Sequence, residues 1–129
     1  MIVVDTSVWI AAFRNDQSKE AGHLRTLLDA DEVALPAPVR VEILAGASRV
    51  DRVRLRRTLS ALPVFYPSEA TWIRIESWLD VISAAGGWFG MGDLLIAAIS
   101  ADREDAVWSL DSDFSRMDKL KLIKLYRPT

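Results

Sequence analysis

Short apolar runs alternate with longer amphipathic segments along the chain. The runs at 2–4, 32–36 and 106–110 are mostly apolar, as is typical of strands buried on both faces. A further run at 62–67 predicts another short strand. In the segment 119–126 lysines alternate with apolar residues, which predicts a strand at the edge of the sheet. The pattern therefore predicts a sheet of four to five strands.

The segments between these runs carry apolar residues at the three- and four-residue spacing of helices. We expect helices over 5–14, 18–31, 37–46, 49–61, 68–87 and 92–104. The expected buried stripe of the helix at 68–87 consists of Trp72, Ile75, Leu79 and Ile82. Thr6 or Ser7 is available to cap the first helix, and Ser68 can cap the one that carries this stripe.

Strands that alternate with helices predict a three-layer α/β/α sandwich around a central parallel sheet. With 129 residues the chain is long enough for one compact domain and too short for two, so we expect a single domain over 1–129. Sheets of this kind bind ligands at the carboxyl ends of their strands. Asp5 and Asp111 each directly follow a predicted strand, so we expect them to meet at one edge of the sheet.

Carboxylates interrupt the apolar segments in several places. Asp5 and Asp93 precede apolar helices, Glu42 lies within a mostly apolar helix, and Asp111 and Asp113 follow a strand. Each has an ordinary explanation: aspartates cap helices and occupy turns, and a glutamate can pair with an arginine. Gathered at one edge, however, they would repel and raise one another's pKa unless a cation kept them ionised.

The composition restricts which cation this could be. The chain has no cysteine and a single histidine, His23, which excludes a disulfide framework, a Cys-ligated zinc site and a histidine cluster. Oxygen ligands alone favour Mg²⁺ or Mn²⁺. Such an ion activates a water for attack on phosphorus and neutralises charge on the phosphoryl oxygens. The sequence also lacks a GxSxG elbow and a P-loop lysine, which counts against covalent hydrolysis and NTP binding.

The charge is unevenly distributed. The net charge of −2 gives no overall attraction to nucleic acid. One segment nevertheless gathers Arg49, Arg52, Arg54, Arg56 and Arg57. These arginines form either a solvated helix face or a face that binds RNA phosphates. No apolar stretch approaches the roughly 20 residues of a membrane span, and Asp5 interrupts the apolar start, so we expect a cytoplasmic protein.

Four stretches resemble, in this order, the PIN-domain family and within it the VapC-type toxins of bacterial toxin–antitoxin pairs: "MIVVDTSVWIAAF", "PVRVEILAG", "MGDLLIAA" and "SLDSDF". They extend essentially from end to end. The resemblance implies an α/β/α sandwich, an acidic site for Mg²⁺ or Mn²⁺, and endoribonuclease activity on single-stranded RNA. The family often begins with Asp-Thr-Asn, where this chain has the common variant Asp5-Thr6-Ser7.

The resemblance also assigns roles to residues. It implies the following catalytic acids: Asp5, Glu42, Asp93 and Asp111. Of these, Asp5, Asp93 and Asp111 are expected to bind the metal, one ion or two. Glu42 binds directly or through water, or orients the attacking water, and Asp113 is a possible further ligand. Hydroxyls that support the acids are expected at Thr6, Ser7 and Ser109.

The resemblance further implies partners. VapC-like toxins usually form homodimers, and a VapB-type antitoxin inserts a C-terminal segment, often with an arginine, near the acidic site. Most of the five tryptophans are expected in the core. The pair Trp88-Phe89, beside Asp93, could instead face a partner or stack on bases.

Two other functions are compatible with an acidic site of this kind. One is a metal-dependent phosphatase or phosphoryl-transfer domain, although Asp5-Thr6-Ser7 supplies neither a DxD nucleophile motif nor an acidic pair. The other is a catalytically silent binding module that acts through its antitoxin partner. The presence of all the expected acids argues against lost activity.

Overall fold

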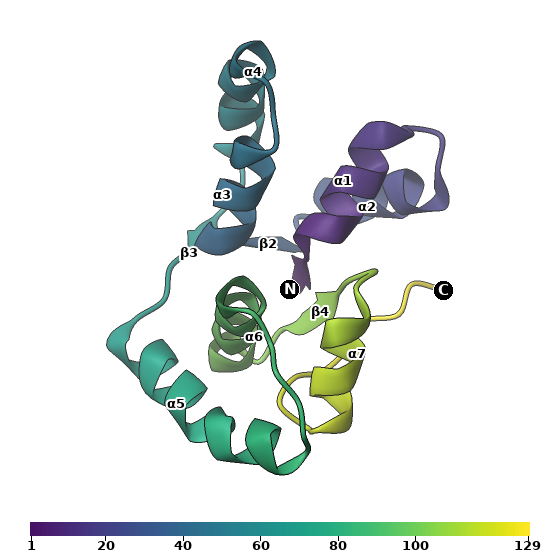
Figure 1. Ribbon diagram of the computed structural model, residues 1–129. Coiled ribbons are helices and arrows are strands. Elements are labelled where there is room, and N and C mark those ends of the chain that lie inside the picture. The colour runs from purple at the N-terminus through teal and green to yellow at the C-terminus, as the bar shows by residue number, and fades with distance from the viewer.

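The computed structural model describes residues 1–129 as short strands alternating with helices (Figure 1). In chain order the elements are β1 (Ile2–Val4), α1 (Thr6–Arg14), α2 (Lys19–Asp29), β2 (Val33–Pro36), α3 (Ala37–Ala45), α4 (Arg49–Leu59), β3 (Val64–Phe65), α5 (Glu69–Ala84), α6 (Met91–Arg103), β4 (Ala106–Trp108) and α7 (Ser112–Lys119). All the strands predicted before residue 110 are present, although the one at 62–67 is reduced to Val64–Phe65.

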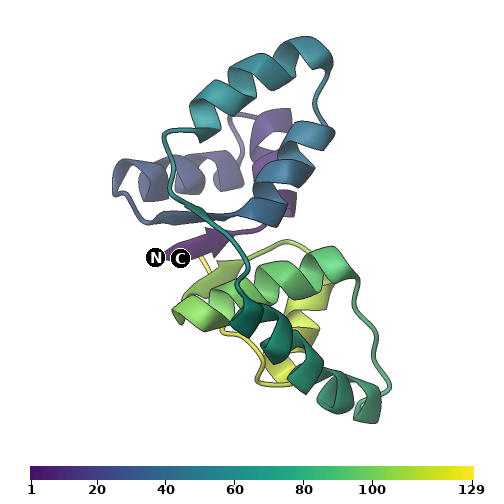
Figure 2. The same ribbon diagram turned by 90° about the vertical axis from the view of Figure 1, so that its left-hand side faces the viewer.

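The strands form one parallel sheet in the order β3-β2-β1-β4. Helices α1 to α4 cover one face of this sheet and α5 to α7 cover the other, so the molecule has three layers (Figures 1 and 2). The predicted α/β/α sandwich is confirmed. Because both faces are covered, the strands can be almost wholly apolar, and every residue of β2 is buried.

The strand order places a topological switch point between β1 and β4. From β1 the chain adds β2 and then β3 on one side, and it then returns to place β4 on the other side of β1. The helices that follow β1 and β4 therefore leave on opposite faces of the sheet (Figure 1). In open α/β sheets this divergence creates a crevice at the carboxyl ends of the strands, which is where ligands bind.

The hydrophobic core lies on both sides of the sheet. Val3, Val4 and Val107 have no exposed surface, and Ile96 of α6 and Phe114 of α7 pack against them from one side. The core therefore fixes the positions of the helices that carry Asp93 and Asp113. None of the helices combines the length and apolar character needed to cross a membrane.

The strand predicted over 119–126 is wrong. Of this segment only Lys119 has regular structure, as the last residue of helix α7, and the chain then turns at Lys121, whose φ is +62°. Beyond that turn, only Leu125 pairs with β4, in a single parallel bridge to Val107. The alternating lysines have the pattern of an edge strand, but the first half of the segment 119–126 ends helix α7 and reverses the chain.

The predicted stripe of α5 is also partly wrong. The buried residues are Thr71, Ile75, Trp78 and Ile82, whereas Trp72 and Leu79 are 44% and 47% exposed. Thr71 fixes the rotation of the helix, because its Oγ1 accepts from the backbone N–H of Ser68 at 2.9 Å and donates to Asp102 Oδ2 at 2.6 Å. A buried hydroxyl with two partners therefore faces the core in place of a tryptophan.

Candidate acidic site

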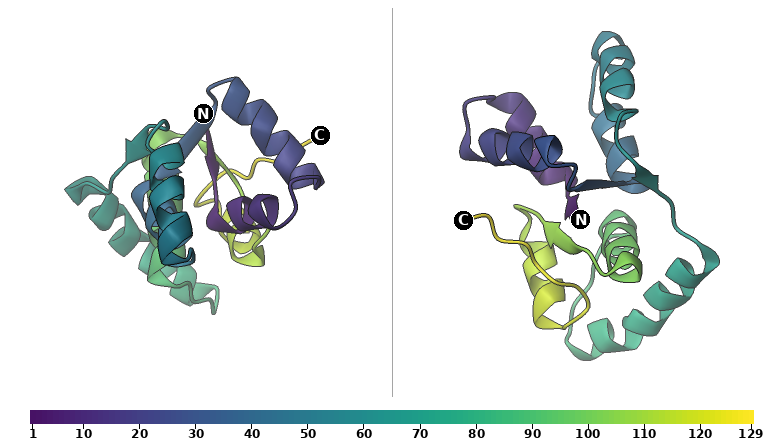
Figure 3. Two further views of the ribbon diagram at one scale, coloured as in Figure 1. Left: turned by 90° about the horizontal axis from the view of Figure 1, so that it is seen from above. Right: turned by 180° about the vertical axis from the view of Figure 1, so that it is seen from behind.

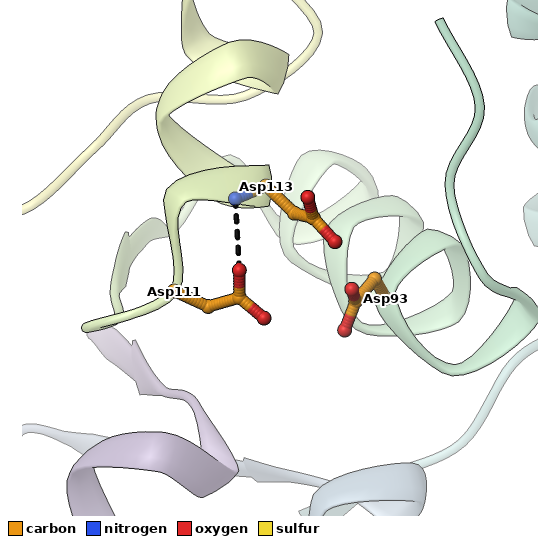
Figure 4. Close-up of side chains that lie close together, drawn as sticks. All are labelled: Asp93, Asp111 and Asp113. Carbon is orange, nitrogen blue, oxygen red and sulfur yellow. Dashed lines mark hydrogen bonds between the residues drawn. The ribbon is translucent and has the colours of Figure 1, made fainter.

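Aspartates from three elements meet at the crevice between β1 and β4. Asp93 lies in the first turn of α6, Asp111 follows β4, and Asp113 lies in the first turn of α7. Their side chains point toward one another (Figure 4), and one oxygen from each lies within 4.8 Å of the other two. The fold thus brings Asp93 next to Asp111 and Asp113, which follow it by about 20 positions, close enough for the three to bind one ion.

Asp5 lies at the end of β1, is only 4% exposed, and is not among the carboxylates that lie within 4.8 Å of one another. It is the N-cap of α1, and its Oδ2 accepts from the backbone N–H and Oγ of Ser7, at 3.3 and 2.7 Å, and from Ser109 Oγ at 2.8 Å. Asp5 Oδ1 accepts no hydrogen bond, yet no buried side-chain oxygen is unpaired, so Oδ1 is accessible. Asp5, rather than Thr6 or Ser7, caps the helix, and it retains a free oxygen.

Ser109 joins the ends of β1 and β4. Its hydroxyl donates to Asp5 and accepts from the backbone N–H of Asp111 at 2.9 Å. Asp111 in turn caps α7, with Oδ1 accepting from the backbone N–H of Asp113 at 2.9 Å. The expected supporting hydroxyls of Ser7 and Ser109 are therefore in direct contact with Asp5, and they hold its orientation.

Glu42 stands at the rim of the site. Its side chain is exposed, and Oε1 accepts from Thr6 Oγ1 at 2.8 Å. A Cβ at Gly92 would lie 3.7 Å from Glu42 Oε2, so this carboxylate reaches the first turn of α6 immediately before Asp93. Glu42 is not among the carboxylates that lie within 4.8 Å of one another. The hydroxyl of Thr6 donates to Glu42 and not to Asp5.

Arg116 was not anticipated from the sequence. Its Nη2 donates to Asp113 Oδ1 at 2.6 Å, and its guanidinium lies 4.5 Å from the centre of the Phe89 ring. This hydrogen bond lowers the pKa of Asp113 below its usual range. An aspartate three residues before an arginine on a helix is a recognisable pair, but it is visible only once α7 is known to be helical.

The environment of Asp93 has the opposite effect. Its pKa is raised from an ordinary value of 3.8 to about 7, first by burial, then by its hydrogen bond to Asp113, and further by the charges of Asp111 and Asp5. Without a cation, therefore, the surroundings of Asp93 favour its protonated form, whereas Arg116 favours the ionised form of Asp113. A divalent ion would take the place of that proton.

We expect the raised pKa of Asp93 to make the metal-free protein less stable as pH rises from about 4 to about 7. In this range the folded chain binds more protons than the unfolded chain, so the free energy of unfolding decreases with pH. Because solvent screens this partly open site, we expect a loss of about 1–2 kcal/mol. Urea unfolding in EDTA across this range measures it.

The same series with Asp93→Asn is the control. Its stability should lack this downward component, whereas Asp113, with its lowered pKa, should contribute stability that is lost only as pH falls toward its folded value. An equal decrease in both proteins between pH 4 and 7 would show that another group is responsible.

The tryptophan-phenylalanine pair beside Asp93 is divided between core and surface. Phe89 is 4% exposed and supports Arg116, whereas Trp88 is 79% exposed. Trp9, Trp78 and Trp108 are buried, as expected for most of the tryptophans. Trp88 thus presents an exposed aromatic ring in the segment that leads into α6, five residues before Asp93.

The arginines of α4 have different surroundings. Arg52 donates to the carbonyls of Leu44 and Ala47, at 3.0 and 3.3 Å, so it stabilises the C-terminal end of α3. Arg54 forms an exposed ion pair with Asp51 at 3.5 Å. The other arginines of the helix are exposed and form no ion pair: Arg49, Arg56 and Arg57.

The donor set of the site fits a hard divalent cation. Every candidate ligand is a carboxylate oxygen, and Asp5 Oδ1 is accessible and accepts no hydrogen bond. Mg²⁺ and Mn²⁺ prefer such oxygens, completed by water or phosphate. Burial and, after it, the neighbouring carboxylates raise the pKa of Asp93, and a bound cation would relieve the repulsion among these carboxylates.

Comparison with known families agrees with this architecture. The family model of the PIN domain matches residues 2–120. The chain therefore belongs to the PIN-domain family, as the resemblance in the sequence had implied.

Individual relatives include ribonucleases of the VapC type. The chain is 30% identical to Ribonuclease VapC11 of Mycobacterium tuberculosis, over 88% of this chain and 89% of that protein. It is 32% identical to Ribonuclease VapC5 of the same species, over 97% of this chain and 93% of that protein. Nearly the whole chain is therefore similar to these ribonucleases.

Solved structures share the fold. The chain aligns at a TM-score of 0.79 and 17% identity with a chain of VapBC2 from Rickettsia felis bound to a DNA fragment from the promoter, covering 98% of both chains. It aligns at a TM-score of 0.72 and 22% identity with VapBC-5 from Mycobacterium tuberculosis, over 98% of this chain and 97% of that one. At these identities the similarity concerns the fold.

Proposed function

We propose that this single domain is the toxin of a VapBC-type toxin–antitoxin pair, a metal-dependent endoribonuclease that cuts RNA in the cytoplasm. The observation that carries the proposal is the convergence of Asp93, Asp111 and Asp113 at the switch point of the sheet, where Ser109 links Asp111 to Asp5. The similarity to VapC ribonucleases over most of the chain supports the same activity.

The proposed ligands of Mg²⁺ or Mn²⁺ are Asp5, Asp93 and Asp111. When bound, such an ion would lower the pKa of a water and neutralise charge on the phosphoryl oxygens. Asp113, fixed by Arg116, holds negative charge beside Asp93 and is a possible further ligand. Glu42 accepts a hydrogen bond from Thr6 at the open rim of the site, a position suited to orienting the attacking water.

RNA would approach over exposed groups around the site. Trp88 offers a ring on which a base can stack, and Arg49, Arg56 and Arg57 of α4 are exposed and unpaired. Arg54 can exchange its weak, exposed partner for a phosphate. Arg52 donates to backbone carbonyls at the end of α3, so its role is to hold α4 against α3 rather than to contact RNA.

Replacing both Arg56 and Arg57 with glutamine is expected to weaken RNA binding and to reduce the slope of log affinity against log salt by about 1–2. The matched variant Arg52→Gln should leave that slope unchanged and lower the free energy of unfolding by about 1–2 kcal/mol, because two carbonyls lose their donor. Fluorescence anisotropy with a labelled RNA measures the slope. An unaltered slope in the double variant would remove α4 from the RNA-binding surface.

The proposed partners are an antitoxin and a second copy of this chain. A groove of about 570 Å³ lies between α1, α3 and α4, where Ile10 and Phe13 are 37% and 51% exposed, and Glu42 lines it toward the acidic site. This groove is suited to an apolar antitoxin segment that ends near the carboxylates. Exposed Trp72 and Leu79 of α5 offer an apolar surface for the homodimer.

Incubation of the purified, antitoxin-free protein with end-labelled total RNA tests the activity. We expect discrete fragments with Mg²⁺ or Mn²⁺ and none with EDTA. Hydrolysis of a small phosphate ester with RNA left intact would favour the phosphatase alternative. Metal binding without cleavage of any RNA would favour the binding module.

A further inference from the structure

A second pocket lies on the other side of the β4–α7 connection. Its volume is about 680 Å³, within the range of small-ligand sites, and it is open to solvent. Its walls come from the first turns of α2, from Trp108 to Leu110 after β4, and from the C-terminal segment. Both views of Figure 3 show this C-terminal segment ending beside α2.

The pocket adjoins the acidic site directly. Ser109 lines the pocket, and its hydroxyl donates to Asp5 and accepts from the N–H of Asp111. The segment from Ser109 to Asp111 thus separates the two sites by a single stretch of backbone. Leu110, which lies between Ser109 and Asp111 and lines the pocket, is 53% exposed, so it does not bury this connection.

Aromatic rings form one wall of the pocket. His23 meets Trp108 edge to face with centroids 5.1 Å apart, and its Nε2 forms a 2.6 Å hydrogen bond with the hydroxyl of Tyr126. Trp108 is buried, so the accessible surface of this wall is provided by the partly buried His23 and Tyr126. Such a wall suits a flat heterocycle, because base–aromatic stacking does not depend on the identity of the base.

Cations stand at the mouth of the pocket. Lys19 and Arg127 line it and form no ion pair. Lys19 is also the first residue of α2, whose N-terminal end carries partial positive charge. One acidic side chain, Glu20, lines the pocket as well, so the balance of side-chain charge at this end is positive.

Gly22 keeps the pocket open. It lies inside α2, where glycine lowers stability relative to alanine, and it lines the pocket. A Cβ at this position would meet only Arg25 Nη2, at 3.9 Å, so close packing does not require glycine. The absence of a side chain here leaves space in the pocket that no packing contact requires.

We propose that this pocket binds a nucleotide of the RNA strand that flanks the phosphodiester being cut. The base would lie against Tyr126 and His23, and the phosphate near Lys19 and Arg127. The inference rests on the proposed ribonuclease function, and it assigns part of the substrate contact to the face opposite Glu42 and α4.

Filling the pocket tests the proposal. Gly22→Leu should project into the space, whereas Gly22→Ala, the matched control, should leave most of it open. Binding of each ribonucleoside monophosphate to the full chain is measured by calorimetry, with inorganic phosphate as a separate probe, and KM and kcat are measured on the RNA that the wild type cuts. We expect Gly22→Leu to raise the nucleotide Kd and the KM about tenfold or more, with kcat and folding retained.

A second variant tests the pocket without changing the interior of α2. Lys19→Gln combined with Arg127→Gln should raise the same two constants several-fold and reduce their salt dependence. Equal nucleotide affinity and equal KM in both variants and the wild type would overturn the proposal, as would binding of inorganic phosphate as tight as that of the nucleotides. If the wild type cuts no RNA, the ribonuclease function fails, and the nucleotide titration alone decides whether the pocket binds nucleotides.

Discussion

Replacing Asp93 with asparagine is expected to lower the rate of RNA cleavage by about 100-fold or more and to stabilise the metal-free protein near pH 8. The two effects have one physical cause. Asp93 is partly buried beside Asp111, Asp113 and Asp5, so its negative charge is unfavourable in the free protein and useful only when a cation is present. A neutral amide of the same shape removes both the repulsion and the ligand.

The two measurements are a cleavage time course in Mg²⁺ or Mn²⁺ and thermal unfolding in EDTA at pH 5 and pH 8. The melting temperature of Asp93→Asn should exceed that of the wild type at pH 8 and approach it at pH 5. Asp80→Asn on the exposed side of α5 is the matched control and should change neither rate nor melting temperature. Cleavage by Asp93→Asn at the wild-type rate would exclude Asp93 as a ligand.

Much of the fold is encoded by local pattern. The strands β1, β2 and β4 are apolar on both faces, so both faces must be buried. This requires helices on either side of a parallel sheet. That sheet, in turn, brings the residue after β1 and the residue after β4 to the same edge. The closeness of Asp5 and Asp111 could therefore be predicted without any knowledge of distances.

Features set by single long-range contacts could not be predicted in this way. The rotation of α5 depends on the bond between Thr71 and Asp102, 31 residues apart, so the sequence periodicity favoured Trp72 on the buried side. Helix α7 is stabilised by the burial of Phe114 and Met117 in the core. With only these two apolar residues, its sequence resembled that of a turn. Arg116 was missed for the same reason, since its partner Asp113 is adjacent only on a helix.

Asp5 can serve both as the cap of α1 and as a metal ligand, because its two oxygens are used differently. A helix cap and a metal ligand were alternative explanations from the sequence, yet the structure gives each oxygen a separate environment. Oδ2 accepts every hydrogen bond from Ser7 and Ser109, and Oδ1 remains accessible. The cap thus holds the side chain through one oxygen and leaves the other oxygen free of hydrogen bonds.

Two substitutions separate these roles. Asp5→Asn retains an oxygen for the backbone N–H of Ser7 but loses the charge, so we expect cleavage to fall about 100-fold with the fold intact. Asp5→Ala should lose the same activity and also be less stable than Asp5→Asn by about 2–3 kcal/mol, because α1 loses its cap and the partly buried hydroxyls of Ser7 and Ser109 lose their acceptor.

Both variants remove the same repulsion from Asp93, so their difference in unfolding free energy isolates the hydrogen bonds of Oδ2. Urea unfolding of the two proteins in EDTA measures that difference, and Asp16→Ala, which removes only an exposed contact to Gln17, is the control for losing an aspartate. Equal stability of Asp5→Ala and Asp5→Asn would mean that the cap contributes nothing. The orientation of the Asp5 carboxylate would then need another cause than the bonds of Ser7 and Ser109.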